Sequence, residues 1–245
     1  MKHVAVVIGL IISVVFLFAQ SVIFNTGEWE PYTTTKPGGK GAVNEIVIAA
    51  CSAGNIELDL RFFPWERCEQ NVQKGAAFAA FPYRITEERS AKYYFSDVLI
   101  TSRGGIFYWE GRGSDIDWLS LKDFGNVRWG GLQGYWYLDE LKKLGIKYDS
   151  IATTEQAIFM LKSGRIQYFI EDELVCKMVA ERILGSEIGK LKMFTKPANM
   201  STLHLIVSRQ YPDSRALLDQ FNKGLAIIKR NGVYASILKK YGIKY

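Results

Sequence analysis

The sequence contains few residues that could act together as a catalytic acid and base. Glu171 and Asp172 are neighbours at the end of an apolar segment, so in a strand their side chains would point to opposite faces. His3 lies in an apolar amino-terminal segment, which leaves His204 as a lone histidine, more often structural than catalytic. No metal-ligand spacing, nucleotide-binding loop or nucleophile elbow is present. These observations argue against an enzyme, and we expect no metal and no other cofactor.

The segments that would position these residues alternate between strand and helix patterns. Residues 56, 58, 60 and 62 are apolar at every second position, which is typical of a strand with one buried face. Residues 43, 46, 47, 50 and 51 repeat at helical spacing. In the first part of the chain we therefore expect strands at 21–25, 56–62 and 78–81, and helices at about 43–51 and 65–74.

The rest of the chain continues this alternation, which predicts an α/β fold. Thr154 is expected to cap a helix over 155–162, and Gly232 to stop a helix that Pro212 and Asp213 open. The other elements expected are strands at 106–109, 127–131, 168–171, 191–194 and 203–207, a helical turn at 119–124, and helices at 137–144, 174–184 and from 233 onward.

The amino terminus has the pattern of a secretory signal peptide. Lys2 supplies a positive start, Val4–Phe18 is almost wholly apolar, and Ala19 and Gln20 lead into a different pattern. Large side chains stand where a cleavage site prefers small ones, so an uncleaved anchor is the alternative. Cleavage after residue 20 would export the protein.

Three cysteines in an exported protein permit one disulfide and leave one thiol over. Cys51 and Cys68 are close in sequence, on helices that we expect to be neighbours, whereas Cys176 is alone on a later helix. We predict a Cys51–Cys68 disulfide, and the alternative is three buried thiols.

The composition is that of a globular protein, and it does not favour a nucleic-acid partner. Of the 245 residues, 48% are hydrophobic and 23% are charged, enough for one large core or two smaller ones. The formal net charge is +6, but the basic residues are scattered. Short pairs such as Lys142-Lys143 and Lys239-Lys240 are typical of solvated helix faces.

Several motifs resemble those of a known family. Residues 85–89 (ITEER) and 95–97 (FSD) resemble the signature of family 3 of the bacterial extracellular solute-binding proteins, which serve polar amino-acid importers. Residues 27–32 (GEWEPY), 132–136 (LQGYW) and 164–172 (GRIQYFIED) are similar to its ligand-binding segments. Residues 221–241 resemble its terminal helices, so the likeness covers nearly the whole chain after the signal segment.

The resemblance implies a two-lobed α/β fold of the periplasmic-binding-protein type II, with two crossing hinge strands and a ligand in the cleft. Residues 1–20 would be the signal peptide, 21–103 plus 202–245 the first lobe, and 104–201 the second. The crossing strands would be 104–109 and 202–207. The resemblance further implies a monomeric protein, periplasmic or extracellular, that passes an amino acid or related small carboxylate to the permease of an ABC transporter.

The resemblance also indicates residues for the two ends of a zwitterion. Arg89 matches an arginine that grips the ligand carboxylate through its planar fork. The alternative is a surface ion pair with Glu87, Glu88 or Asp97. Asp172 matches the acid that holds the α-amino group, while the alternative is an N-cap for the next helix. Both roles of Asp172 can coexist.

The expected walls of the cleft are aromatic. Gly134, Tyr135 and Trp136 lie where a helix begins and free N–H groups attract an anion, although Tyr and Trp replace the family's small hydroxyl residues. Trp29 matches an aromatic residue that packs over the ligand, and Trp65 opens the second helix. Each of these two tryptophans could equally be a core residue.

Other positions depart from the family pattern and leave the ligand open. Arg84 replaces a small hydroxyl residue and, facing the cleft, would add a second cation that Glu171 could offset. Ala77 and Gln167 stand where many relatives carry Asp. The candidate ligand-binding residues are Trp29, Trp65, Tyr83, Arg84, Arg89, Gly134, Tyr135, Trp136 and Asp172.

Two other functions are compatible with the same fold. Enzymes such as cyclohexadienyl dehydratases and lytic transglycosylases share it, but they need positioned acids that this sequence does not pair. A periplasmic ligand-sensing module is the other alternative, with a separate partner that recognises the closed form.

Overall fold

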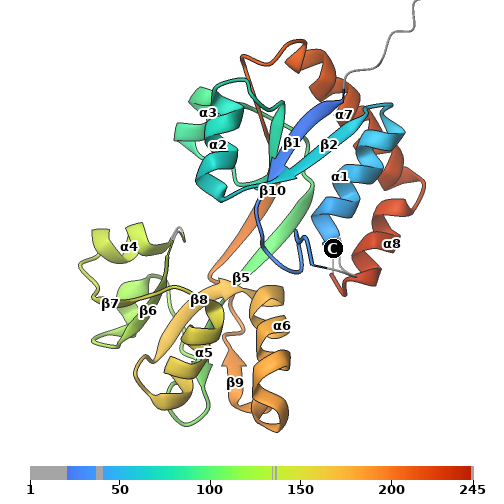
Figure 1. Ribbon diagram of the computed structural model, residues 1–245. Coiled ribbons are helices and arrows are strands. Elements are labelled where there is room, and N and C mark those ends of the chain that lie inside the picture. The colour runs from blue at the N-terminus through green and yellow to red at the C-terminus, as the bar shows by residue number, and fades with distance from the viewer. Residues whose placement is uncertain (1–20, 37–40, 134, 136, 244–245) are drawn as a thin grey trace, which may run out of the picture.

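The computed structural model describes residues 21–36, 41–133, 135 and 137–243. The predicted signal peptide at 1–20 therefore lies outside the described residues. Two groups of elements are linked by the long strands β5 (Ile100–Trp109) and β10 (Asn199–Val207), as Figure 1 shows. These strands pair antiparallel, from Ile100 opposite Leu203 to Gly104 opposite Asn199. The division into lobes at 103/104 and 201/202 stays a prediction.

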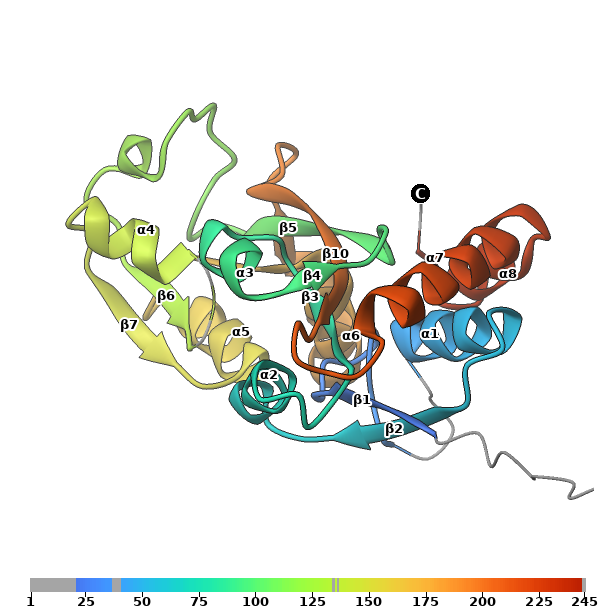
Figure 2. The ribbon, with the colours of Figure 1, turned by 90° about the horizontal axis from the view of Figure 1, so that it is seen from above.

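The first group is a sheet in the order β2-β1-β3-β10, with helices on both faces. β1 runs parallel to β2 and β3, and β10 runs antiparallel to β3 and β4. The helices α7 and α8 lie beside α1 (Figure 2). The elements are β1 (Val22–Thr26), α1 (Ala42–Ala53), β2 (Leu58–Phe62), α2 (Trp65–Gln73), β3 (Ala79–Tyr83), α3 (Glu87–Lys92), β4 (Tyr94–Phe95), α7 (Ser214–Arg230) and α8 (Val233–Lys240).

The predicted Cys51–Cys68 disulfide is wrong, because the two thiols lie on opposite faces of this sheet. Consecutive residues of β1 point to opposite faces. Phe24 packs in the same core as Cys51 of α1, whereas Ile23 packs against the core that contains Cys68 of α2. All three cysteines, Cys176 included, are free and buried.

The second group continues the strand order as β5-β8-β6-β7, with β9 paired to β5. β8 is antiparallel to β5 and parallel to β6. Phe169 and Ile170 of β8 belong to two different cores, one on each face of the sheet. The elements are η1 (Leu121–Phe124), β6 (Trp129–Leu132), α4 (Tyr137–Lys143), β7 (Tyr148–Ile151), α5 (Thr154–Ser163), β8 (Tyr168–Asp172), α6 (Glu173–Leu184), η2 (Gly185–Lys190) and β9 (Leu191–Met193).

The structure corrects one predicted helix cap. Thr153, not Thr154, is the N-cap of α5, and its hydroxyl accepts a hydrogen bond from the Gln156 N–H. The Thr154 hydroxyl instead donates to the side chain of Glu171. In the described part of the chain, no helix is both long enough and apolar enough to span a membrane.

Candidate ligand-binding site

Asp172 lies where β8 ends and α6 begins, close to where the two groups of elements meet. Its Oδ1 atom accepts hydrogen bonds from the N–H groups of Leu174 (3.0 Å) and Val175 (3.2 Å), so the side chain is the N-cap of α6. The Tyr32 hydroxyl donates to both carboxylate oxygens, at 3.0 and 3.1 Å. Burial raises the pKa of Asp172 to about 6, although these hydrogen bonds act in the opposite direction.

The neighbouring Glu171 is a buried carboxyl group that connects three segments. Its Oε1 atom accepts from the Tyr135 hydroxyl at 2.5 Å and from the Asp172 N–H at 2.7 Å. Its Oε2 atom accepts from the Thr154 hydroxyl. Burial raises the pKa of Glu171 to about 7, and the adjacent Asp172 charge acts in the same direction. Glu171 thereby ties Tyr135 and the start of α5 to the end of β8.

Trp29 and Tyr32 belong to a loop between β1 and α1 that is held by the start of the helix. Their rings stack with centroids 4.4 Å apart. The helix α1 has no side-chain cap. Its first N–H groups, those of Ala42 and Val43, donate instead to the carbonyl oxygens of Pro31 and Tyr32. The helix start thus fixes the position of the Tyr32 hydroxyl. Trp29 also lies close enough to the Tyr135 hydroxyl to lower its pKa, against the larger effect of burial.

Arg84, directly after β3, lies within electrostatic range of Asp172, Tyr135 and Arg89. Partial burial lowers the pKa of Arg84, while Asp172 and Tyr135 act in the opposite direction. The structure thus brings a cation from the first group toward an anion from the second. The sequence left open whether Arg84 faces the cleft or solvent, and this coupling favours the cleft.

Arg89 lies in a separate aromatic cluster between α2 and α3. Its guanidinium group forms an ion pair with Glu69 at 3.2 Å and lies over the Tyr83 ring, 4.9 Å from the centroid. The Tyr83 hydroxyl donates to the Trp65 carbonyl at 3.0 Å. Trp65 is 36% exposed, and its indole covers the backbone of Gly27 so closely that a Cβ there would clash.

The described site residues thus form two clusters, and Arg84 lies within electrostatic range of both, through Asp172 and Arg89. Trp29, Arg84, Tyr135 and Asp172 interact around the acids, whereas Trp65, Tyr83 and Arg89 form the second cluster. Gly134 and Trp136 lie outside the described residues. Sequence reasoning missed three polar partners, which are Tyr32, Glu69 and Thr154. Tyr32 was inside a motif that resembled a ligand loop, but nothing in the sequence marked its hydroxyl.

The remaining sequence candidates have structural contacts. The His204 ring is buried, with one nitrogen 2.8 Å from the Ser96 carbonyl oxygen and the other 2.9 Å from the Thr202 hydroxyl. Ala77 is buried in a core, and the Gln167 side chain accepts from the Arg128 N–H at 2.7 Å. These contacts support the structural interpretation of His204.

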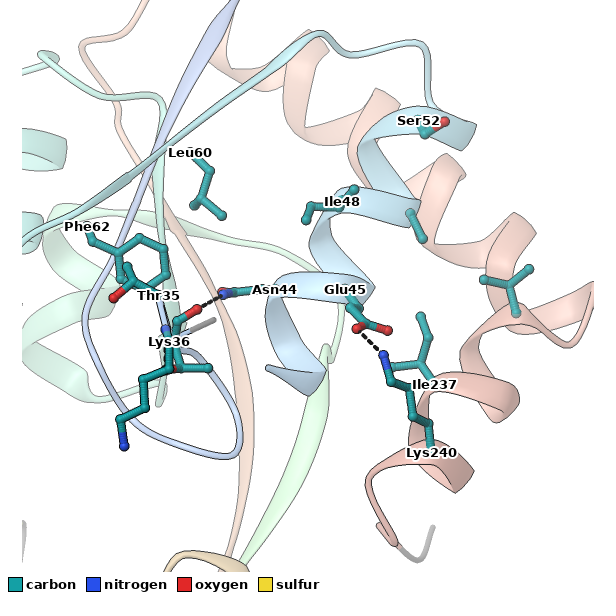
Figure 3. Close-up of a pocket in the computed structure, with 13 residues that line it drawn as sticks. Thr35, Lys36, Asn44, Glu45, Ile48, Ser52, Leu60, Phe62, Ile237 and Lys240 are labelled. Atoms are coloured by element: carbon teal, nitrogen blue, oxygen red, sulfur yellow. Dashed lines mark hydrogen bonds and ion pairs between the residues drawn. The ribbon is translucent and has the colours of Figure 1, made fainter. Parts of the chain in front are cut away.

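A groove of about 940 Å³ lies elsewhere, between α1, β2 and α8 (Figure 3). Its walls are mainly apolar, and the charged side chains on its rim are already paired, Lys240 with Glu45 and Lys36 with Glu30. None of the predicted ligand-binding residues that the structure describes lines it. The groove therefore lies apart from the contacts around Asp172 described above.

Comparisons with known proteins agree with the motifs. Residues 22–244 match the family described as bacterial extracellular solute-binding proteins, family 3. A curated relative, the arginine-binding periplasmic protein of Mannheimia haemolytica, is 26% identical over 231 residues, which cover 91% of each chain.

Solved structures show the same fold at low sequence identity. The arginine-, lysine-, histidine-binding protein ArtJ of Geobacillus stearothermophilus has a TM-score of 0.71 and 20% identity, covering 91% of this chain and 95% of its own. A histidine kinase sensor domain with similarity to periplasmic binding proteins has a TM-score of 0.75 and 16% identity, covering 91% and 96%. The predicted α/β fold of the periplasmic-binding-protein type II is thereby confirmed.

Proposed function

Because the chain belongs to family 3 of the bacterial extracellular solute-binding proteins, we propose that it captures an amino acid outside the cytoplasm for the permease of an ABC importer. The observation that carries this proposal is the buried Asp172 carboxylate, with the cationic Arg84 in electrostatic range. The relative from Mannheimia haemolytica, whose name states that it binds arginine, supports an amino-acid ligand.

The anionic Asp172 and the cationic Arg84 can bind the two oppositely charged ends of a zwitterion. An ionised carboxylate offers about four acceptor positions. Backbone N–H groups of α6 occupy Oδ1 of Asp172, whereas Tyr32 is the only donor to Oδ2 among the contacts described above. A ligand ammonium group would bind at Oδ2, and the ligand carboxylate would bind at Arg84 and Arg89.

Arg89 can take part only by sharing its guanidinium group with Glu69. Their ion pair is partly exposed, so it is weak enough for a ligand carboxylate to compete. In this proposal Trp29, Trp65, Tyr83 and Tyr135 form the aromatic walls around the ligand. Gly134 and Trp136 stay sequence-based predictions, because they lie outside the described residues.

A bridging ligand would also explain how binding is signalled. The first lobe would supply the arginines and the second lobe the acid, with β5 and β10 as hinge strands. Only a closed arrangement lets both ends of the ligand bind, so the ligand stabilises that arrangement. The transporter would then recognise the closed form of a monomeric, exported protein whose signal peptide, residues 1–20, has been removed.

We propose no enzymatic activity for this site. Glu171 is buried and its pKa is raised to about 7, as in many general acids. However, both of its oxygens already accept hydrogen bonds, from Tyr135, Thr154 and the Asp172 backbone. It therefore acts better as a support for the ligand-binding groups than as a proton donor to a substrate.

Titration calorimetry with protein that has been unfolded and refolded to remove bound ligand tests the proposal. A panel of amino acids should contain at least one ligand. Its N-acetyl derivative and its methyl ester should each bind far more weakly, because each lacks one of the two charges. Arg84→Ala should weaken binding, whereas Arg182→Ala, at an exposed ion pair of α6, should not. Equal binding of the derivatives, or no binding by any amino acid, would overturn the proposal.

A further inference from the structure

The Tyr32 hydroxyl has a role that neither the motif nor the family match assigns. It is the donor of a hydrogen bond that joins two segments 140 residues apart. Tyr32 is 1% exposed and Asp172 is 5% exposed. A hydrogen bond to an ionised group in such a buried place is stronger than one between neutral groups. The contact therefore affects the charged form of Asp172 more than its neutral form.

The position of this hydroxyl is fixed from both sides. The Tyr32 carbonyl accepts from the Val43 N–H at 2.8 Å, and the Tyr32 N–H donates to the Trp29 carbonyl at 2.8 Å. The ring stacks on Trp29. The loop, the stacked ring and the helix start keep Tyr32 in place. Its hydroxyl can therefore bind the Asp172 carboxylate without the cost of ordering a mobile side chain.

We propose that Tyr32 is a positioning residue for ligand recognition, whose hydroxyl keeps the Asp172 carboxylate ionised and directs Oδ2 toward a primary ammonium group of the ligand. Oδ1 accepts from the N-terminal N–H groups of α6 and from Tyr32, whereas Oδ2 accepts from Tyr32 alone among the contacts described above. Oδ2 therefore remains for one contact with the ligand. This inference rests on the proposed function, since it concerns the same site.

The proposal makes the affinity depend on pH in a defined direction. A ligand cation binds the ionised form of Asp172, so affinity falls as the pH falls through the pKa of that group. The Tyr32 hydroxyl donates to the charged form and lowers this pKa. Its removal raises the pKa, so affinity is lost at a higher pH. Other titratable or charged groups that face Asp172 are Glu171, Glu173, Arg84, Tyr135 and Cys176.

Two of these groups, Glu171 and Glu173, are held by contacts that do not involve Tyr32. Glu171 is bonded to Tyr135 and Thr154, and Glu173 is paired with Arg103 at 2.6 Å. Tyr32→Phe removes no partner from these contacts. A change in the pH profile of this variant therefore reports on the Tyr32–Asp172 contact itself.

The experiment compares the parent with Tyr32→Phe, which keeps the ring and its stack on Trp29. Calorimetry with the amino acid that the parent binds gives affinities at about pH 8 and about pH 6. We expect the ratio of the two affinities to be about three- to tenfold larger in the variant, as lost hydrogen bonding to a charged group implies. Tyr241→Phe is the matched control, because its hydroxyl also donates to a carboxylate, Glu45, at 2.9 Å outside the site.

The outcomes separate this inference from the proposed function. If the parent binds amino acids and the ratio in Tyr32→Phe equals that in Tyr241→Phe, the inference is overturned and the proposed function stands. If the parent binds no amino acid, both are overturned. Thermal denaturation establishes that each variant is folded. If the Tyr32→Phe variant does not fold, Tyr32→Met removes the same hydroxyl and takes its place.

Discussion

Replacement of Asp172 by asparagine is expected to stabilise the ligand-free protein and to weaken ligand binding. Burial raises the pKa of this carboxyl from its ordinary value of 3.8 to about 6. Above that pH, ionisation in the folded protein therefore costs about 3 kcal/mol, since each tenfold change in proton affinity is worth about 1.4 kcal/mol. Asparagine removes the charge and with it this cost.

The variant keeps most of the structural role of the side chain. Asparagine is as good an N-cap as aspartate, so the N–H groups of Leu174 and Val175 keep an acceptor. The lost attraction between the negative charge and the helix dipole is worth up to about 1 kcal/mol. The expected net effect is a gain of about 2 kcal/mol in the free energy of unfolding above the pKa of Asp172.

Ligand affinity should change in the opposite direction. Without Asp172 the ligand ammonium group is buried with no anionic partner, which costs about 2 kcal/mol or more, or about 30-fold in affinity. Urea denaturation at about pH 8 measures the stability, and calorimetry measures the affinity. Asp219→Asn, at an exposed position of α7, is the control. A variant that is less stable than its parent, or that binds the amino acid as tightly, would refute the reasoning.

Three further predictions concern neighbouring groups. Because burial raises the pKa of Glu171 from 4.5 to about 7 and that of Asp172 from 3.8 to about 6, the stability that their neutral forms provide should be lost as the pH rises from about 4 to about 7. Urea denaturation should show a smaller loss in Glu171→Gln. Glu69→Gln should release Arg89 from its ion pair and raise the affinity for the amino acid by about 1.5- to fivefold. An unchanged affinity in calorimetry would show that Arg89 does not bind the ligand. All three cysteines should react with a thiol reagent only on unfolding, and recovery of a single thiol would indicate a disulfide.

The sequence predicted those elements whose local pattern was strong. Leu58, Leu60 and Phe62 alternate on one face of β2, and the apolar spacing of α1 matches the helix Ala42–Ala53. β7 and α3 escaped prediction because their patterns are weak. β7 exposes both of its central residues, and α3 buries none of its residues. Short elements of this kind are defined by their neighbours and not by their own hydrophobic periodicity.

The candidate site was less predictable, because its decisive contacts join distant segments. The motif around Asp172 predicted this acid as a ligand contact, which stays a prediction, and it did not predict the tyrosine that reaches the acid from the loop after β1. The acids proposed as partners of Arg89 were all close to it in sequence, whereas the structure pairs it with Glu69 of α2. Likewise, spacing alone placed Cys51 near Cys68, although the sheet separates them. Such pairings depend on which sheet face each helix covers.

The contacts of Glu171 indicate why this site contains a second acid beside Asp172. Glu171 faces no cation among its described hydrogen-bond partners, and it holds Tyr135, Thr154 and the Asp172 N–H instead. Two of these partners, Tyr135 and Asp172, are candidate ligand contacts. A buried acid with three donors fixes their relative positions before the ligand arrives, so less ordering is left for the binding step.

The neutral form of Glu171 is favoured by burial and by the neighbouring charge, and a cationic ligand at Asp172 would offset that repulsion. Binding of an ammonium group should therefore draw both acids toward their ionised forms, and it should release protons to the solvent near neutral pH.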